Sequence, residues 1–120
     1  MNKALDSTEL SPDQLVKAEQ VLRIELAGAY RLVDYFGWCE LIYGHLTAHV
    51  PGPEPHFLIN PYGLNYDEVT ASNLVKIDLE GKVVEPTDHQ VNEAGFIIHS
   101  AIHMQPKTQN PVGMHTHSRP

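Results

Sequence analysis

The first third of the chain carries a helical repeat of apolar residues, and this repeat restricts the fold more than any other feature. Apolar side chains recur in steps of three or four from Leu15 to Phe36, which is the period of one face of an α-helix. Ser11 and Gln14 are spaced as a capping box before the repeat, and Gly37 is a natural stop after it. We therefore predict one long amphipathic helix, whose inward face comprises Leu15, Ala18, Leu22, Leu26, Ala29, Val33 and Phe36.

Beyond this helix the apolar period shortens to two, which is typical of β-strands. Residues 41–50 alternate between an apolar face and a polar, histidine-bearing face, and residues 57–59 form a short apolar run. Residues 75–84 have the pattern of a hairpin, and residues 112–117 that of a final strand. A second helix is expected over residues 92–104. Its expected inward face comprises Ala94, Ile98, Ala101 and Ile102.

Helices interleaved with hairpin-type strands predict a layered α/β domain. The domain would occupy residues 11–120, after a polar leader at residues 1–10. The formal charge of −7 disfavours nucleic acid and anionic membrane surfaces as partners. Cys39 is the single cysteine, so no disulfide can form within the chain, and a cytoplasmic location is expected.

His115 and His117 are the sharpest candidates for chemistry. Residues i and i+2 of a strand point to the same face, roughly 6.6 Å apart along the axis, so both imidazoles can converge on one cation. Neutral imidazole suits zinc, iron, manganese or nickel, and the pair alone does not select among them. Catalytic zinc normally has about three protein ligands, so two histidines are too few. The alternative interpretation is two surface or hydrogen-bonded histidines.

The other histidines and one glutamate are weaker candidates. His99 and His103 share a helix face, but the metalloprotease pattern would need a glutamate after the first histidine, so the polar flank of a helix is the preferred interpretation. His45 and His49 share a strand face about 13 Å apart, too far to bind one ion together. Glu93 lies in the first turn of the second expected helix, where the helix N-terminus favours its ionised form.

Four segments, taken in order, resemble class II aldolase/adducin domains. They are YRLVDYFGWCELIYGHLTAHVPG (30–52), HFLINPYGLNYDEVTASNLVKIDLEGKVV (56–84), NEAGFIIHSAIH (92–103) and HTHSRP (115–120). The residues in these four segments are most similar to those of the adducin head and its bacterial relatives. The resemblance covers about residues 20–120, and the order of four blocks is more specific than any single motif.

The resemblance implies a three-layer α/β/α sandwich with a largely antiparallel central sheet. It also implies a divalent metal, zinc in the first place and manganese or iron otherwise, held by His115, His117 and a third histidine beyond Pro120. A chain that is incomplete at its C-terminus is therefore expected. Enzymes of this family are commonly tetramers with sites near subunit interfaces, so a homo-oligomer that binds a small molecule is expected too.

The chain departs from the sugar-phosphate aldolases where those enzymes hold phosphate. His45 stands after Gly44 in place of an asparagine, and Tyr62-Gly63 in place of a Thr-Gly turn. Residues 93–95 stand where a Ser-Ser-Glu run supplies phosphate contacts and the catalytic acid/base, which puts a glycine at the carboxylate position. A carboxylate beside a phosphate repels it. We expect Gly44, His45, Tyr62 and Gly63 to contact substrate, and Glu93 to be catalytic only if the local register differs.

Three functions follow from the resemblance. The first is a metal-dependent lyase for aldol cleavage or decarboxylation of a small, non-phosphorylated oxo or hydroxy acid. The second is a non-catalytic, adducin-like module that binds actin, and the third is an iron-dependent oxygenase on the same fold. Whether this 120-residue chain is itself an active enzyme is left open by its sequence.

Overall fold

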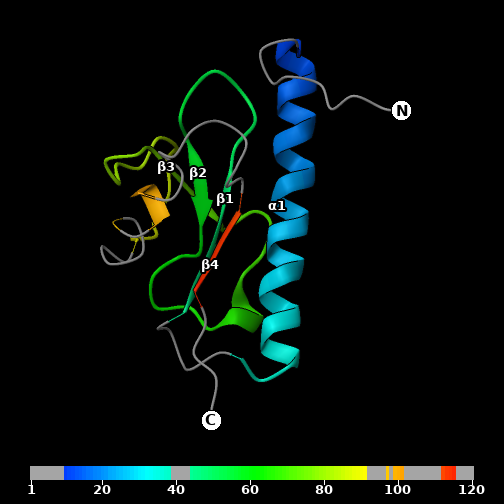
Figure 1. Cartoon of the computed structure of the whole chain (residues 1–120), viewed down its shortest axis with the longest axis vertical. Helices are drawn as coiled ribbons and strands as arrows, with labels where there is room; N and C mark the ends of the chain where they lie inside the picture. Colours follow the sequence, from blue (N-terminus) through cyan, green and yellow to red (C-terminus); the bar gives the residue numbers. More distant parts are fainter. Residues whose placement is uncertain (1–9, 39–43, 92–96, 98, 102–111, 116–120) are drawn as a thin grey trace.

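A long N-terminal helix, α1, forms one layer of the molecule (Figure 1). The structure is a computed structural model that describes residues 10–38, 44–91, 97, 99–101 and 112–115. Helix α1 spans Pro12–Tyr35, and its predicted capping box is present. The Ser11 amide donates to Gln14 Oε1 at 2.8 Å, and the Gln14 amide donates to Ser11 Oγ at 3.2 Å. Gly37 follows the helix with a φ of 71°, a left-handed conformation that favours glycine, as the predicted stop requires.

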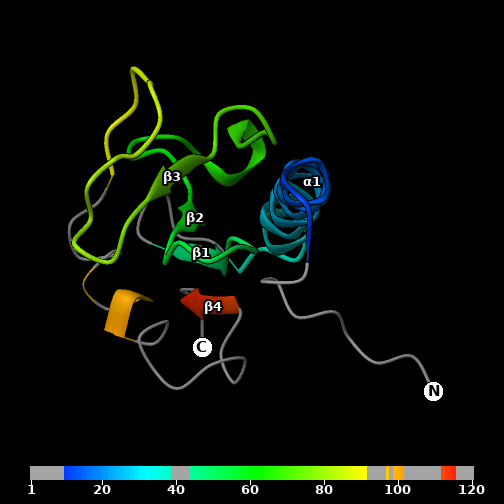
Figure 2. The ribbon, with the colours of Figure 1, turned by 90° about the horizontal axis from the view of Figure 1, so that it is seen from above.

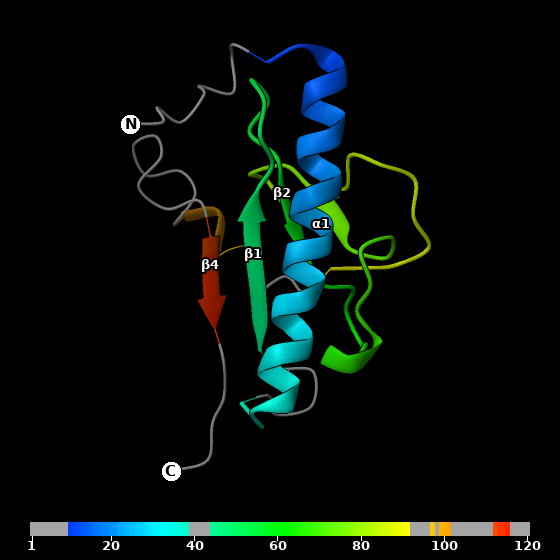
Figure 3. The same cartoon turned by 90° about the vertical axis from the view of Figure 1, so that its right-hand side faces the viewer.

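Four short strands form one antiparallel sheet in the order β3-β2-β1-β4. Their bounds are His45–His49 for β1, Phe57–Ile59 for β2, Val75–Ile77 for β3 and Val112–His115 for β4. The 3-10 helix η2, Tyr66–Glu68, joins β2 to β3. The last strand in sequence therefore lies beside the first, on the edge opposite β3 (Figures 1 and 3). All four strands lie within segments that the sequence pattern predicts.

Helix α1 packs against one face of the sheet (Figure 2). Of the predicted inward residues Leu26 and Val33 are buried, whereas Phe36 is 56% exposed, which corrects the prediction. Phe36 follows the last helical residue and stacks on Trp38 instead, with ring centroids 5.2 Å apart. Tyr30 is completely buried although the apolar pattern omits it. The buried cluster on this face comprises Leu26, Ala27, Tyr30, Val33, Leu46, Ala48, Val50, Leu58, Tyr66, Val69 and Leu74.

The opposite face of the sheet is covered too, which makes the architecture three-layered and largely antiparallel. Helical residues 97 and 99–101 lie across the sheet from α1 (Figure 2). Their orientation corrects the prediction, because Ala101 is exposed while His99 and Ser100 are buried. The apolar residues buried on this side are Phe57, Ile59, Val75 and Ile77. None of the helices in the described ranges combines the length and apolar character that a bilayer span requires.

Ion pairs connect α1 to β3 and to the segment after it. Glu19 and Arg23 form an (i, i+4) pair at 3.0 Å, and their side chains are largely buried. Lys76 of β3 reaches Glu19 at 2.6 Å and Glu85 at 3.2 Å, and Arg23 reaches Glu85 at 3.1 Å. Burial alone would raise the pKa of Glu19, but hydrogen bonds from Lys76 and Arg23 and their charges outweigh it and lower that pKa.

This lowered pKa predicts an acid-sensitive contribution to stability. A carboxyl whose pKa is lower in the folded chain stabilises it above the unfolded-state pKa, and that stabilisation is lost as pH falls through the folded-state value. Glu19→Gln should therefore lower the free energy of unfolding at pH 7 by about 1 kcal/mol, a modest effect because the network is partly solvated. Urea denaturation at pH 7 and near pH 3 should show the difference from wild type shrinking on acidification. The matched control is Glu25→Gln, on the exposed side of the same helix; an equal, pH-independent effect of both changes would contradict the prediction.

Candidate functional site

Tyr30 of α1 fixes one end of the sheet. The β1–β2 register pairs Ala48 with Leu58, and its continuation brings Leu46 level with Asn60. The Tyr30 hydroxyl lies at this point and accepts from the Leu46 amide at 2.7 Å and from the Asn60 amide at 3.3 Å. Its single proton can be donated to the Leu46 carbonyl or to Asn60 Oδ1. Burial raises the pKa of Tyr30 well above its usual value, so the hydroxyl keeps its proton.

A buried polar cluster lies on the face of β1 that points away from α1. It consists of His45, Thr47 and His99, exposed by 2%, 0% and 1%. His99 Nδ1 lies 2.6 Å from Thr47 Oγ1, and His99 Nε2 lies 2.9 Å from His45 Nδ1. The two imidazole rings meet edge to face, with centroids 4.6 Å apart. His99 thus uses both ring nitrogens to bridge two residues of β1. The predicted polar helix flank is therefore not open to solvent at His99, which is buried against β1.

Strand β4 completes the cluster from its edge. The ladder places Gly113 opposite Thr47 and His115 opposite His45. A Cβ atom on Gly113 would lie 2.6 Å from His99 Nδ1, closer than real Cβ atoms approach, and 3.0 Å from Thr47 Oγ1, which is tighter than most real Cβ contacts. Glycine is therefore required here so that β4 can lie against the imidazole. The only sequence signal for this role is a glycine inside a predicted strand, which often marks a close backbone approach.

Several predicted site residues gather at the same end of the sheet. Gly44 and His45 begin β1, Tyr62 and Gly63 follow the end of β2, and the backbone of His115 ends β4. Gly44 is buried, while Tyr62 is half-exposed and Gly63 adopts a φ of 91°. Glu93, His103 and His117 lie outside the described residues, as does the side chain of His115. In the part of the chain that the structure describes, no group of three or more His, Cys, Asp or Glu side chains could hold a metal ion.

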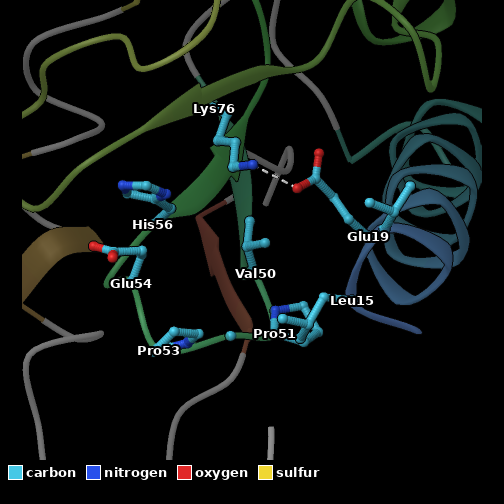
Figure 4. A pocket seen from close by; sticks show the side chains of 10 residues that line it. Leu15, Glu19, Val50, Pro51, Pro53, Glu54, His56 and Lys76 are labelled. Atoms are coloured by element: carbon cyan, nitrogen blue, oxygen red, sulfur yellow. Dashed lines mark hydrogen bonds and ion pairs between the residues drawn. The ribbon is translucent and has the colours of Figure 1, made fainter. Parts of the chain in front are cut away.

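An open depression of about 270 Å³ lies at the other end of β1. It is bounded by Leu15 of α1, by the loop that follows Val50, and by Lys76 of β3 (Figure 4). Of its three charged side chains, Glu19 and Lys76 neutralise each other across α1 and β3, and Glu54 lies exposed in the loop. This depression therefore offers less for catalysis than the histidine cluster.

Comparisons with known proteins find relatives of this chain over most of its length. A family model described as "Class II Aldolase and Adducin N-terminal domain" matches residues 24–120. A protein of Caulobacter vibrioides named after the class 2 aldolases is 52% identical over 85% of this chain and 39% of its own length. Alpha-adducin of Rattus norvegicus is 50% identical over 83% of this chain and 14% of its own length. The chain thus spans well under half of these relatives.

A solved structure supports the fold. The L-fuculose 1-phosphate aldolase from Glaciozyma antarctica superposes with a TM-score of 0.81 and 31% identity. The match covers 94% of this chain and 46% of that one. The arrangement of α1, the antiparallel sheet and the helical residues behind it is therefore that of a known enzyme fold.

Proposed function

Because the chain belongs to the class II aldolase and adducin N-terminal domain family, we propose that it contributes to a divalent-metal site of the lyase type. His115 and His117 would be ligands, with zinc as the preferred ion and manganese or iron as alternatives. The observation that carries the proposal is the register of β4, which sets the backbone of His115 opposite His45 and beside a buried, hydrogen-bonded pair of histidines.

The surroundings of this strand fit metal binding by imidazoles. Ligating histidines need hydrogen-bonding neighbours that orient them, and a strand backed by apolar side chains offers none. Here β4 lies against Thr47, His99 and His45, all polar and all buried. When bound, the ion would polarise a carbonyl or carboxylate oxygen and stabilise the charge that develops as a carbon–carbon bond breaks.

The residues at this end of the sheet support a proposal for the substrate class. We propose a small, non-phosphorylated oxo or hydroxy acid, contacted by Gly44, His45, Tyr62 and Gly63. Tyr62 is half-exposed and can reach a bound molecule with its ring and hydroxyl. Glu93 would be the acid/base only if the local register differs from the one that the family resemblance implies. By the family resemblance it occupies a phosphate-binding position, where its negative charge would repel a phosphorylated sugar.

Calorimetric titration of the metal-free chain with Zn²⁺ tests the site. One ion per chain is expected to bind, and His115→Ala combined with His117→Ala should abolish binding. The control, His56→Ala combined with His89→Ala, removes the same number of imidazoles from half-exposed positions elsewhere and should bind as wild type does. Cleavage of at least one of a panel of small oxo and hydroxy acids is then expected of a zinc-loaded form that also carries the third histidine.

Two results would overturn this proposal. Zinc binding that persists after both His115 and His117 are replaced would show that these residues are not the ligands. A chain that binds no zinc but sediments with filamentous actin would instead be a non-catalytic interaction module, which its 50% identity to Alpha-adducin makes the second candidate.

A further inference from the structure

The cluster of His45, Thr47 and His99 forms a continuous chain of hydrogen bonds. His99 is its centre, with Thr47 at Nδ1 and His45 at Nε2. A neutral imidazole has one N–H donor and one acceptor nitrogen. One of the two bonds of His99 is therefore donated by the ring and the other is accepted by it. Because all three side chains are buried, a neutral ring is favoured over a charged one.

The distances indicate the direction in which this chain runs. The contact between Thr47 Oγ1 and His99 Nδ1 is 2.6 Å. That is shorter than the usual range of about 2.7–3.2 Å for an N–H donor but within the range of about 2.5–3.0 Å for a hydroxyl donor. This distance favours Thr47 as the donor to His99 Nδ1. The proton of His99 is then on Nε2, which donates to His45 Nδ1 at a normal 2.9 Å.

The direction of the chain assigns the tautomer of His45. Because His45 Nδ1 accepts a hydrogen bond, a neutral His45 ring carries its own proton on Nε2. A protonated nitrogen can neither coordinate a metal ion nor act as a base. We propose that Thr47 and His99 are positioning residues that hold His45 as a hydrogen-bond donor for an anionic oxygen, such as a substrate carboxylate. This role rests on the proposed function, whereas the tautomer itself does not.

The assignment distinguishes His45 from the other histidines of the site. His45 begins β1 directly opposite His115, so its place alone would make it a candidate third ligand. The hydrogen-bond chain argues against that role. It gives His45 the chemistry of a side-chain amide N–H, which matches the asparagine that the family resemblance places at this position. The site would then combine the proposed ligands His115 and His117 with a donor histidine on β1.

Nitrogen NMR of the metal-free chain labelled with ¹⁵N-histidine tests the tautomer at mildly alkaline pH, where the rings are neutral. In wild type His45 and His99 should both be protonated on Nε2 and unprotonated on Nδ1. Thr47→Val removes the hydroxyl that contacts His99 Nδ1, so the proton of His99 is no longer held on Nε2. Because His99 is the residue that contacts His45 Nδ1, the His45 ring should then shift toward a mixture of tautomers. Thr47→Ser keeps the donor and should restore the wild-type pattern.

The outcomes separate this inference from the metal site. A wild-type His45 protonated on Nδ1, or a folded Thr47→Val chain whose His45 signals are unchanged, would overturn the inference. If Thr47→Val does not fold, the wild-type and Thr47→Ser spectra still decide it. Added Zn²⁺ should leave the proton of His45 Nε2 in place. Its loss on zinc binding would make His45 a ligand and overturn the donor role, whereas a failure to bind zinc would affect only the proposed function.

Discussion

Replacing Tyr30 with Phe is expected to lower the free energy of unfolding by about 3 kcal/mol, because a buried polar group left without a partner costs roughly 1–3 kcal/mol. The Tyr30 hydroxyl accepts hydrogen bonds from the amides of Leu46 and Asn60, and it can donate one to the Leu46 carbonyl. All of these groups belong to buried residues, so water cannot simply replace the hydroxyl. Urea denaturation followed by circular dichroism measures the loss.

Tyr35→Phe is the matched control for this change. Tyr35 belongs to the same helix and is 82% exposed, so removing its hydroxyl should change stability by less than about 0.5 kcal/mol. If Tyr30→Phe cost no more than Tyr35→Phe, the Tyr30 hydroxyl would not be what joins the start of β1 to the end of β2. The predicted substrate contacts Gly44 and Tyr62 lie at that end, so Tyr30→Phe should also weaken substrate binding.

Local patterns predicted the elements of this fold but not all of its contacts. Helix α1, its capping box and the strand positions follow from periods and caps, which depend on near neighbours in sequence. Tyr30 did not appear on the predicted inward face because the period counts apolar side chains, and its phenol has a polar tip. The hydroxyl can be buried because it forms hydrogen bonds with backbone groups of residues 46 and 60. These residues are distant in sequence, so a local pattern cannot reveal the contacts.

In the candidate site, too, some residues could be predicted from the sequence and others could not. The sequence singled out Gly44, His45, Tyr62 and Gly63, and the structure brings these to one end of the sheet. It missed Thr47 and Gly113 and made His99 only a weak candidate, because the roles of these residues depend on layers that meet only after folding. His99 has the spacing of a polar helix flank, yet its partners lie 52 and 54 residues away. The functional roles of the four residues that the sequence singled out, like those of His115, His117 and Glu93, stay predictions.

Gly113→Ala is expected to destabilise the chain by about 3 kcal/mol, since overpacking a core costs roughly 1–3 kcal/mol and a broken buried hydrogen bond adds to that. The new methyl group would lie 2.6 Å from His99 Nδ1 and 3.0 Å from Thr47 Oγ1. Either β4 must move away from β1 or the His99 ring must leave Thr47. The ¹⁵N signals of His99 and His45 should therefore change together with the urea midpoint.

Gly28→Ala makes the same chemical change in the opposite environment. No heavy atom outside its neighbourhood in the helix lies within 4 Å of a Cβ built on Gly28 in α1. Alanine is favoured over glycine inside a helix by roughly 0.5–1 kcal/mol, so this variant should be more stable than wild type. A Gly113→Ala chain as stable as wild type, with unchanged histidine signals, would mean that β4 does not lie against His99. The proposed metal site would then lose its structural support, because that proposal depends on β4 lying beside the cluster of His45, Thr47 and His99.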